Sequence, residues 1–160
     1  MLYEYDGRRP TVGKDSYVSD IAHVIGDVMI GDNCYIGHGA ILRGDYGSIV
    51  VGSGTAVEEG VVVHAPPGRY CRIGERVTIG HGAVIHAAKI GDSAVIGMGA
   101  VVSIESEIGE GTIVAEGTVI RMRQMVAAGV VVGIVGTVAA SIEQILEHYD
   151  LSFGRATAAG

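Results

Sequence analysis

One aliphatic residue returns every six positions along most of this 160-residue chain, and this period constrains the fold more than any other feature. An amphipathic helix would repeat its apolar face at three and four residues, and a half-buried strand would alternate at two. A period of six, with glycine often following the aliphatic residue, is typical of β-helices built from hexapeptides. The repeating positions are Val12, Val18, Val24, Ile30, Ile36, Leu42, Val51, Val57, Val63, Ile73, Ile79, Ile85, Ile90, Ile96, Val102, Ile108, Val114, Ile120, Val126, Val132 and Val138.

The period predicts an all-β fold, a left-handed parallel β-helix in which three hexapeptides form one triangular coil. We expect residues 1–140 to form this domain. After it the apolar residues take helical spacing and Ser141 suits an N-cap, so we predict a C-terminal α-helix over residues 141–151, packed on the β-helix. Residues 152–160 are predicted to form a polar tail.

The period is interrupted three times near the middle of the chain. The segment from Leu42 to Val51 is longer than six residues, as is the segment from Val63 to Ile73, whereas the segment from Ile85 to Ile90 is one residue short. Insertions in a solenoid form loops on one face, which is often the working face. We therefore expect the functional residues in this region.

Composition limits the partners and the compartment. The formal net charge of −7 argues against nucleic acid as the main partner, because phosphate binding needs a basic face. Cys34 and Cys71 lack the spacing of a zinc knuckle, and a disulfide framework is not expected. The start of the chain lacks the apolar stretch of a signal peptide, and the apolar run 126–140 is short for a membrane span. We expect a soluble, cytoplasmic protein without a membrane partner.

The repeat also predicts which side chains lie beside one another. Leu42, Val63 and Ile85 should stack in successive coils, so the residues that follow them should form an outward column: Arg43, His64 and His86. Neighbouring strands lie about 4.8 Å apart. His64 and His86 are therefore expected to lie close enough to bind one ion together.

A second column contains His38, Glu59, His81 and Met98. Five extended residues separate His81 from His86, which is roughly 16 Å. One chain therefore does not easily bring His81 onto the other two histidines, whereas a neighbouring copy does. We infer a homotrimer with one shared three-histidine site at each interface.

Three neutral imidazoles with an open fourth position are the ligand set of a catalytic zinc site. Fe²⁺ or Co²⁺ suits the same ligands.

The same residues carry a resemblance to the γ-class carbonic anhydrases, and it extends over nearly the whole chain. It is strongest at Leu42–Asp45, in the strand that ends at His64, and from Ile79 to His86. The resemblance implies zinc on His64 and His86 of one subunit and His81 of its neighbour. It implies attack of metal-bound hydroxide on CO2 to give bicarbonate. It also implies that Arg43 and Asp45 form an ion pair at the trimer interface.

The sequence departs from that family before the first histidine ligand. The family often has amides there, whereas this chain has Ala56 and Glu58. Glu58 could accept a proton, or it could hold the bound water too tightly. Tyr46 follows Asp45 where the founding type has a glutamate, and the loop 65–72 lacks the founding type's acidic shuttle. We take Glu58, Arg43, Asp45 and Tyr46 as the candidate catalytic residues.

Two other functions remain open from the sequence. An acyl-CoA-dependent acyltransferase with hexapeptide repeats would use an interface histidine as its general base. A metal-containing trimer with weak or no catalysis would serve as a binding or assembly subunit, and Ala56 and Glu58 keep this reading open.

Overall fold

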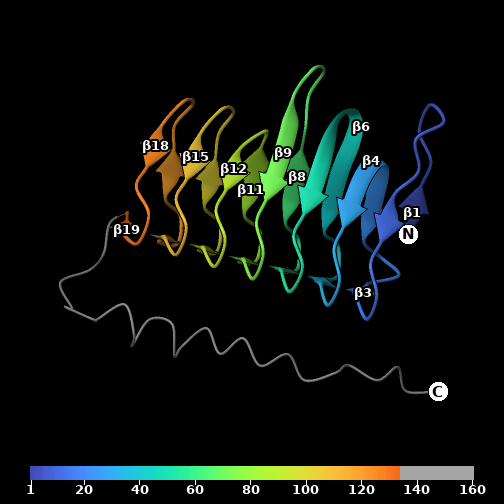
Figure 1. The fold of residues 1–160 in the computed structure, drawn as a ribbon, viewed down its shortest axis with the longest axis horizontal. Helices are drawn as coiled ribbons and strands as arrows, with labels where there is room; N and C mark the ends of the chain where they lie inside the picture. Colours follow the sequence, from blue (N-terminus) through green and yellow to red (C-terminus); the bar gives the residue numbers. More distant parts are fainter. Residues whose placement is uncertain (134–160) are drawn as a thin grey trace.

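The computed structural model describes residues 1–133, and all 19 of their regular elements are β-strands. The coils follow one another along the long axis of the molecule, from the N-terminal coil to the coil that contains β19 (Figure 1). The predicted parallel β-helix is confirmed, because every pair of strands is parallel. The predicted helix 141–151, the tail 152–160 and the end of the predicted domain lie outside the described residues.

The strands form three faces of a prism. The first face contains β1 (Leu2–Tyr3), β8 (Val62–His64), β11 (Val84–His86), β14 (Val101–Val102), β17 (Val119–Ile120) and the first halves of β4 (His23–Ile30) and β6 (Ile41–Val51). The second face contains β2 (Thr11–Val12), β9 (Tyr70–Ile73), β12 (Lys89–Ile90), β15 (Glu107–Ile108), β18 (Met125–Val126) and the second halves of β4 and β6. The third face contains β3 (Tyr17–Val18), β5 (Tyr35–Ile36), β7 (Ala56–Val57), β10 (Thr78–Ile79), β13 (Val95–Ile96), β16 (Ile113–Val114) and β19 (Val131–Val132).

The periodic aliphatic residues line the interior of the prism. Leu42 pairs with Val63, and Val63 pairs with Ile85, so each inward side chain lies against its equivalent in the next coil. These three residues are fully buried. Burial of an aliphatic side chain stabilises the folded state by about 1.5–3 kcal/mol relative to leaving it exposed. Cys34 and Cys71 are also buried and free, and both lie in the hydrophobic core.

The three interruptions of the period take different forms. The sequence predicts a loop for the first interruption, and this prediction is wrong. The extra residues lengthen β6, which continues round the corner from the first face to the second. The second lies between β8 and β9, where Gly47 donates to the carbonyl of Ala65. The third shortens the corner after β11, where Ala87 adopts a positive φ of 46°. All three lie at the same corner, beside His64 and His86.

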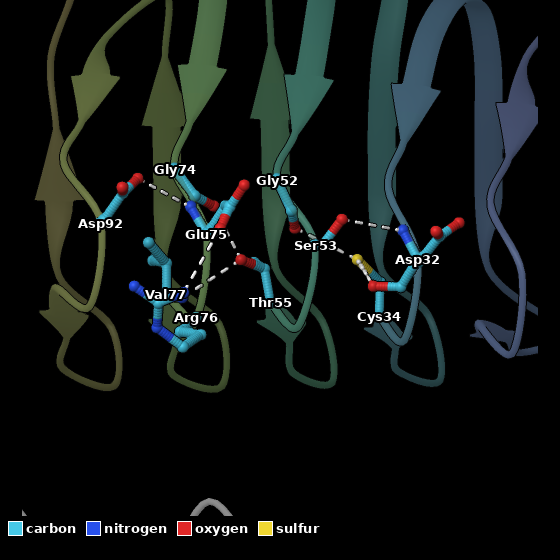
Figure 2. Close-up of polar contacts among 10 residues, drawn as sticks. All are labelled: Asp32, Cys34, Gly52, Ser53, Thr55, Gly74, Glu75, Arg76, Val77 and Asp92. Atoms are coloured by element: carbon cyan, nitrogen blue, oxygen red, sulfur yellow. Dashed lines mark hydrogen bonds and ion pairs between the residues drawn. The ribbon is translucent and has the colours of Figure 1, made fainter.

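Polar side chains link successive coils at the corner between the second and third faces (Figure 2). The backbone N–H of Asp32 donates to the hydroxyl oxygen of Ser53 at 3.1 Å. One coil later, the Thr55 hydroxyl donates to the carbonyl of Gly74 at 2.8 Å and accepts from the N–H of Val77 at 3.1 Å. Because Thr55 is fully buried, its hydroxyl replaces water for both backbone groups.

Within residues 1–133, the structure contains no helix long and apolar enough to cross a membrane.

Replacement of Thr55 by valine tests this corner. The side chains are similar in volume, so we expect the fold to be kept while two buried backbone groups lose their partner. The free energy of unfolding should fall by about 1–3 kcal/mol. It would be measured by urea denaturation at one protein concentration.

Ser53→Ala is the matched control, because its hydroxyl bonds the backbone at an exposed position that water can reach. A Thr55→Val variant as stable as the wild type would contradict the assigned role of the hydroxyl.

Candidate metal centre

His64 and His86 lie beside each other on the outside of the first face, as the sequence predicts. Parallel pairing places Arg43 opposite His64 and His64 opposite His86. The two imidazole rings are stacked, with centroids 5.1 Å apart and an angle of 10° between their planes. Each follows an inward aliphatic residue, so the pairing of the core sets the distance between them.

The Nε2 atom of His86 is buried and makes no hydrogen bond to any group in the part of the chain that the structure describes. A buried polar atom without a partner costs about 1–3 kcal/mol, so such atoms are uncommon in folded proteins. A metal ion would use the lone pair of a neutral imidazole at this position. The two stacked imidazoles are therefore a donor set that fits zinc.

His64 has a different partner in the single chain. Its Nε2 lies 2.7 Å from the Nη2 of Arg43. A guanidinium only donates hydrogen bonds, so Nε2 of His64 must be the unprotonated, accepting nitrogen. Burial, followed by the positive charge of Arg43, lowers the pKa of His64 below its ordinary value. A metal bound to His64 would need the same lone pair, so it would compete with Arg43 for this nitrogen.

Asp45 holds the other end of this cluster. Its Oδ1 lies 3.6 Å from Nε of Arg43, so the predicted ion pair is present within one chain. The same oxygen accepts a hydrogen bond from the backbone N–H of Tyr46 at 3.1 Å. Gly44 between them is needed, because a Cβ there would lie 2.5 Å from the carbonyl oxygen of Asp27. The Arg43–Asp45 segment can thus approach the preceding coil closely.

Two residues near the N-terminus complete the surroundings of Tyr46, and sequence reasoning missed both. The hydroxyl of Tyr5 lies 3.1 Å from that of Tyr46, and their rings meet edge to face. Arg8 donates to the carbonyl oxygen of Asp45. No repeat relates these residues to β6, so the spacing in the sequence carried no signal for the contact.

His81 lies at another corner, in the turn between β10 and β11. The residue after each member of the predicted column donates to the carbonyl of the member one coil before it: Gly60 to His38, Gly82 to Glu59, and Gly99 to His81. The predicted column of His38, Glu59, His81 and Met98 is therefore confirmed. Nδ1 of His81 lies 2.9 Å from Oε2 of Glu59.

The corner that contains His81 also contains the carboxylates of Glu58 and Glu59. Ligand atoms of Glu58, Glu59 and His81 lie within 4.8 Å of one another. Burial, followed by the charge of Glu59, raises the pKa of Glu58. The pKa of Glu59 is lowered, mainly by the hydrogen bond that it accepts from the Tyr35 hydroxyl. Glu58 therefore holds a proton more readily than its neighbour does.

The two stacked histidines line an open groove of ≈ 570 Å³ on the first face. Its apolar wall contains Ile41, Val62, Val84 and Val101, and its polar wall contains Arg43, Ser103 and the histidines. His81 is not among the lining residues of this groove.

Comparison with known proteins agrees with this architecture. The family model for the bacterial transferase hexapeptide (six repeats) matches residues 9–44 and 70–103, and the model for the hexapeptide repeat of succinyl-transferase matches residues 27–65. A hexapeptide transferase family protein from Anaplasma phagocytophilum superposes with a TM-score of 0.82 and 35% identity, over 92% of this chain and 89% of that chain. These matches support the left-handed β-helix predicted from the period.

Two curated relatives are also similar in sequence. Carnitine operon protein CaiE of Escherichia coli O157:H7 is 39% identical over 100 residues, which are 62% of this chain and 51% of CaiE. Gamma carbonic anhydrase 2, mitochondrial, of Arabidopsis thaliana is 43% identical over 101 residues, which are 59% of this chain and 36% of that protein. The chain thus spans about half the length, or less, of these curated relatives.

The fold and the outward columns define a β-helix protein built from hexapeptide repeats. The chain belongs to the hexapeptide-repeat family that includes CaiE and the γ-carbonic anhydrases, as the resemblance predicted.

The contact between Arg43 and His64 predicts how His64 titrates in the metal-free protein. Its pKa should lie below the ordinary value of about 6.5, and Arg43→Gln should raise it by removing the neighbouring positive charge. NMR titration of the imidazole would measure this. Arg72→Gln on the second face is the control and should leave the pKa of His64 unchanged.

The same shift has a consequence for stability. Between the lowered pKa and about 6.5, the unfolded chain binds more protons at this residue than the folded chain does. The free energy of unfolding of the metal-free protein should therefore fall as the pH drops through this window, and fall less in Arg43→Gln. An unchanged His64 pKa in that variant would contradict the contact.

Proposed function

We propose that this protein is a metal-dependent, carbonic anhydrase-like hydratase that converts CO2 to bicarbonate at sites shared between the subunits of a homotrimer. The observation that carries the proposal is Nε2 of His86, which lies beside His64, is buried and makes no hydrogen bond within residues 1–133. The plant relative named gamma carbonic anhydrase 2 supports the same chemistry. We assign His64 and His86 of one subunit and His81 of the next as the metal ligands.

The position of His81 supports a shared site. His81 precedes β11 and His86 ends it, so the strand separates them by roughly 16 Å within one chain. The outward residues Ile41, Val62, Val84 and Val101 form an apolar column on the first face, between these corners. A neighbouring copy on this face would bury the column and bring its own His81 to the groove.

Zinc bound by three imidazoles lowers the pKa of a coordinated water to about 7, and so supplies hydroxide at neutral pH. The chain's own residues would do the rest. The apolar wall of the groove suits CO2, which carries no charge. Arg43 provides a positive charge for the bicarbonate product, and Asp45 limits its movement through their ion pair. Tyr46, bonded to Tyr5, lies next to this pair.

Glu58 is the proposed proton acceptor. It is partly buried, and its raised pKa lets the carboxylate take a proton nearer neutral pH than an exposed glutamate would. The γ-class carbonic anhydrases that the sequence resembles often have an amide at this position, and an amide cannot take a proton.

A transferase is the second candidate, because the matching family models and the Anaplasma relative are described as transferases. In that function an interface histidine would deprotonate a hydroxyl or amine acceptor. The proposed set of three histidine ligands exceeds what a single base needs, so we place this function second.

His81→Ala tests the proposed site. Metal content per chain, measured by mass spectrometry after purification without air, should be about one zinc, iron or cobalt in the wild type and should be lost in the variant, because the third ligand is gone. CO2 hydration, measured by stopped flow, should disappear with the metal. His38→Ala, a variant in the same column, should keep both.

The other outcomes separate the candidates. CO2 hydration that survives without metal would rule out the hydratase. Metal that binds without hydration would support the non-catalytic trimer. Absence of metal after reconstitution, together with tight acetyl-CoA binding that chelators do not alter, would support the transferase.

Glu58→Gln tests the proton acceptor. The variant keeps the size of the side chain but cannot accept a proton, so kcat for CO2 hydration should fall by about 100-fold while kcat/KM changes little. Added imidazole buffer should restore much of kcat by carrying the proton instead. Glu110→Gln, at an exposed corner, is the control.

An increase in kcat on this substitution would show that Glu58 hinders turnover, and so contradict the role as acceptor.

A further inference from the structure

The backbone around His81 does little to fix its side chain. His81 lies between Gly80 and Gly82, and its side chain is 55% exposed. Gly82 has a φ of 66° and would have open space around a Cβ. An exposed imidazole can take several rotamers, and a metal ligand must be held in one. Something beyond the turn has to orient this ring.

Glu59 lies directly before His81 in the column of stacked corners. Its Oε2 is 2.9 Å from Nδ1 of His81. A carboxylate accepts hydrogen bonds, so the proton of a neutral His81 is held on Nδ1. The lone pair is then on Nε2, on the other side of the ring. The contact with Glu59 thus selects both the tautomer and the direction that a metal ligand requires.

Tyr35 in turn holds Glu59. The Tyr35 hydroxyl donates to Oε1 of Glu59 at 2.7 Å, so the two carboxylate oxygens have different partners. The Tyr35 ring is itself fixed by stacking on Tyr17, with centroids 5.4 Å apart and an angle of 13° between the ring planes. A tyrosine with few free torsions therefore anchors a glutamate that has more.

Gly37 makes room for this arrangement. A Cβ at Gly37 would lie 3.0 Å from Oε1 of Glu59 and 2.8 Å from its backbone nitrogen. A larger residue would therefore push Glu59 away from the position in which it meets both Tyr35 and His81. Three successive coils thus contribute to one chain of contacts that ends at His81.

We propose that Tyr35 and Glu59 are positioning residues that orient His81, through the chain Tyr35–Glu59–His81, to present Nε2 to the metal site of the neighbouring subunit. This inference rests on the proposed function, because His81 needs this orientation only if it is a ligand. Tyr35 acts through Glu59, and neither residue touches the metal or the substrate. Loss of either should weaken metal binding without changing the set of ligands.

The test is the dissociation constant for Zn²⁺, measured by competition with a chelator at fixed pH on the full chain. The variants are Tyr35→Phe, Glu59→Gln and the double variant. Tyr17→Phe is the matched control, because Tyr17 stacks on Tyr35 but does not donate to Glu59. Light scattering of the metal-free proteins would show that all variants keep the wild-type assembly, and Glu59→Asp replaces Glu59→Gln if that variant does not.

We expect Glu59→Gln to raise the dissociation constant by about 10- to 100-fold, the usual effect of losing the partner of a ligating histidine. Tyr35→Phe should raise it roughly two- to tenfold, as expected for one lost hydrogen bond. The double variant should be no weaker than Glu59→Gln alone, because Tyr35 acts only through Glu59. At saturating Co²⁺, all variants should have the visible spectrum of the wild type.

Three results would overturn the inference. Wild-type affinity in both single variants would show that His81 needs no support. Additive effects in the double variant would show that Tyr35 acts by another route. An altered Co²⁺ spectrum in Glu59→Gln would show that Glu59 is itself a ligand, as the grouping of Glu58, Glu59 and His81 allows.

His81→Ala separates these results from a failure of the proposed function. If His81→Ala binds metal as the wild type does, the shared site is wrong. If His81→Ala loses the metal while Tyr35→Phe and Glu59→Gln keep wild-type affinity, the shared site stands and only the positioning role is wrong.

Discussion

The structure depends on the parallel pairing of each coil with the next, in a register that places every inward aliphatic residue on its equivalent. Val63 must lie on Leu42 and Ile85 on Val63, because a slip by one residue would turn the whole inward column outward. Hydrogen bonds between coils and burial of small aliphatic side chains enforce the same register. At one corner, polar side chains such as Thr55 add a third set of links.

This register also arranges the outside of the prism. A residue next to an inward position occupies a column, and its neighbours are the residues one coil before and one coil after it. The stacked rings of His64 and His86 and the contact of His81 with Glu59 both arise in this way. A solenoid can therefore bring together side chains from short segments that are distant in the sequence, because the packing of the core sets the spacing between them.

A single chain leaves this arrangement incomplete in a specific manner. Within residues 1–133, Nε2 of His86 is buried and makes no hydrogen bond, Nε2 of His64 lies against the guanidinium of Arg43, and His81 lies at a different corner beside Glu59. The proposed trimer would resolve all three features. It would bring a third imidazole to the first-face groove, where a metal would take the place of Arg43 at His64 and use the lone pair of Nε2 of His86.

The period in the sequence by itself determined the β-helix, the inward columns and the stacking of His64 on His86, because each follows from counting residues along a regular repeat. It also placed Glu59 beside His81. Only the tertiary structure decided that Arg43 bonds His64, that Tyr35 holds Glu59, and that Tyr5 and Arg8 reach β6. Those contacts depend on rotamers of long side chains and on an N-terminal segment outside the repeat, which no period describes. The same reason explains why the first insertion extends β6 instead of forming a loop. A count of extra residues gives the length of an insertion, whereas pairing with β4 and β9 decides its conformation.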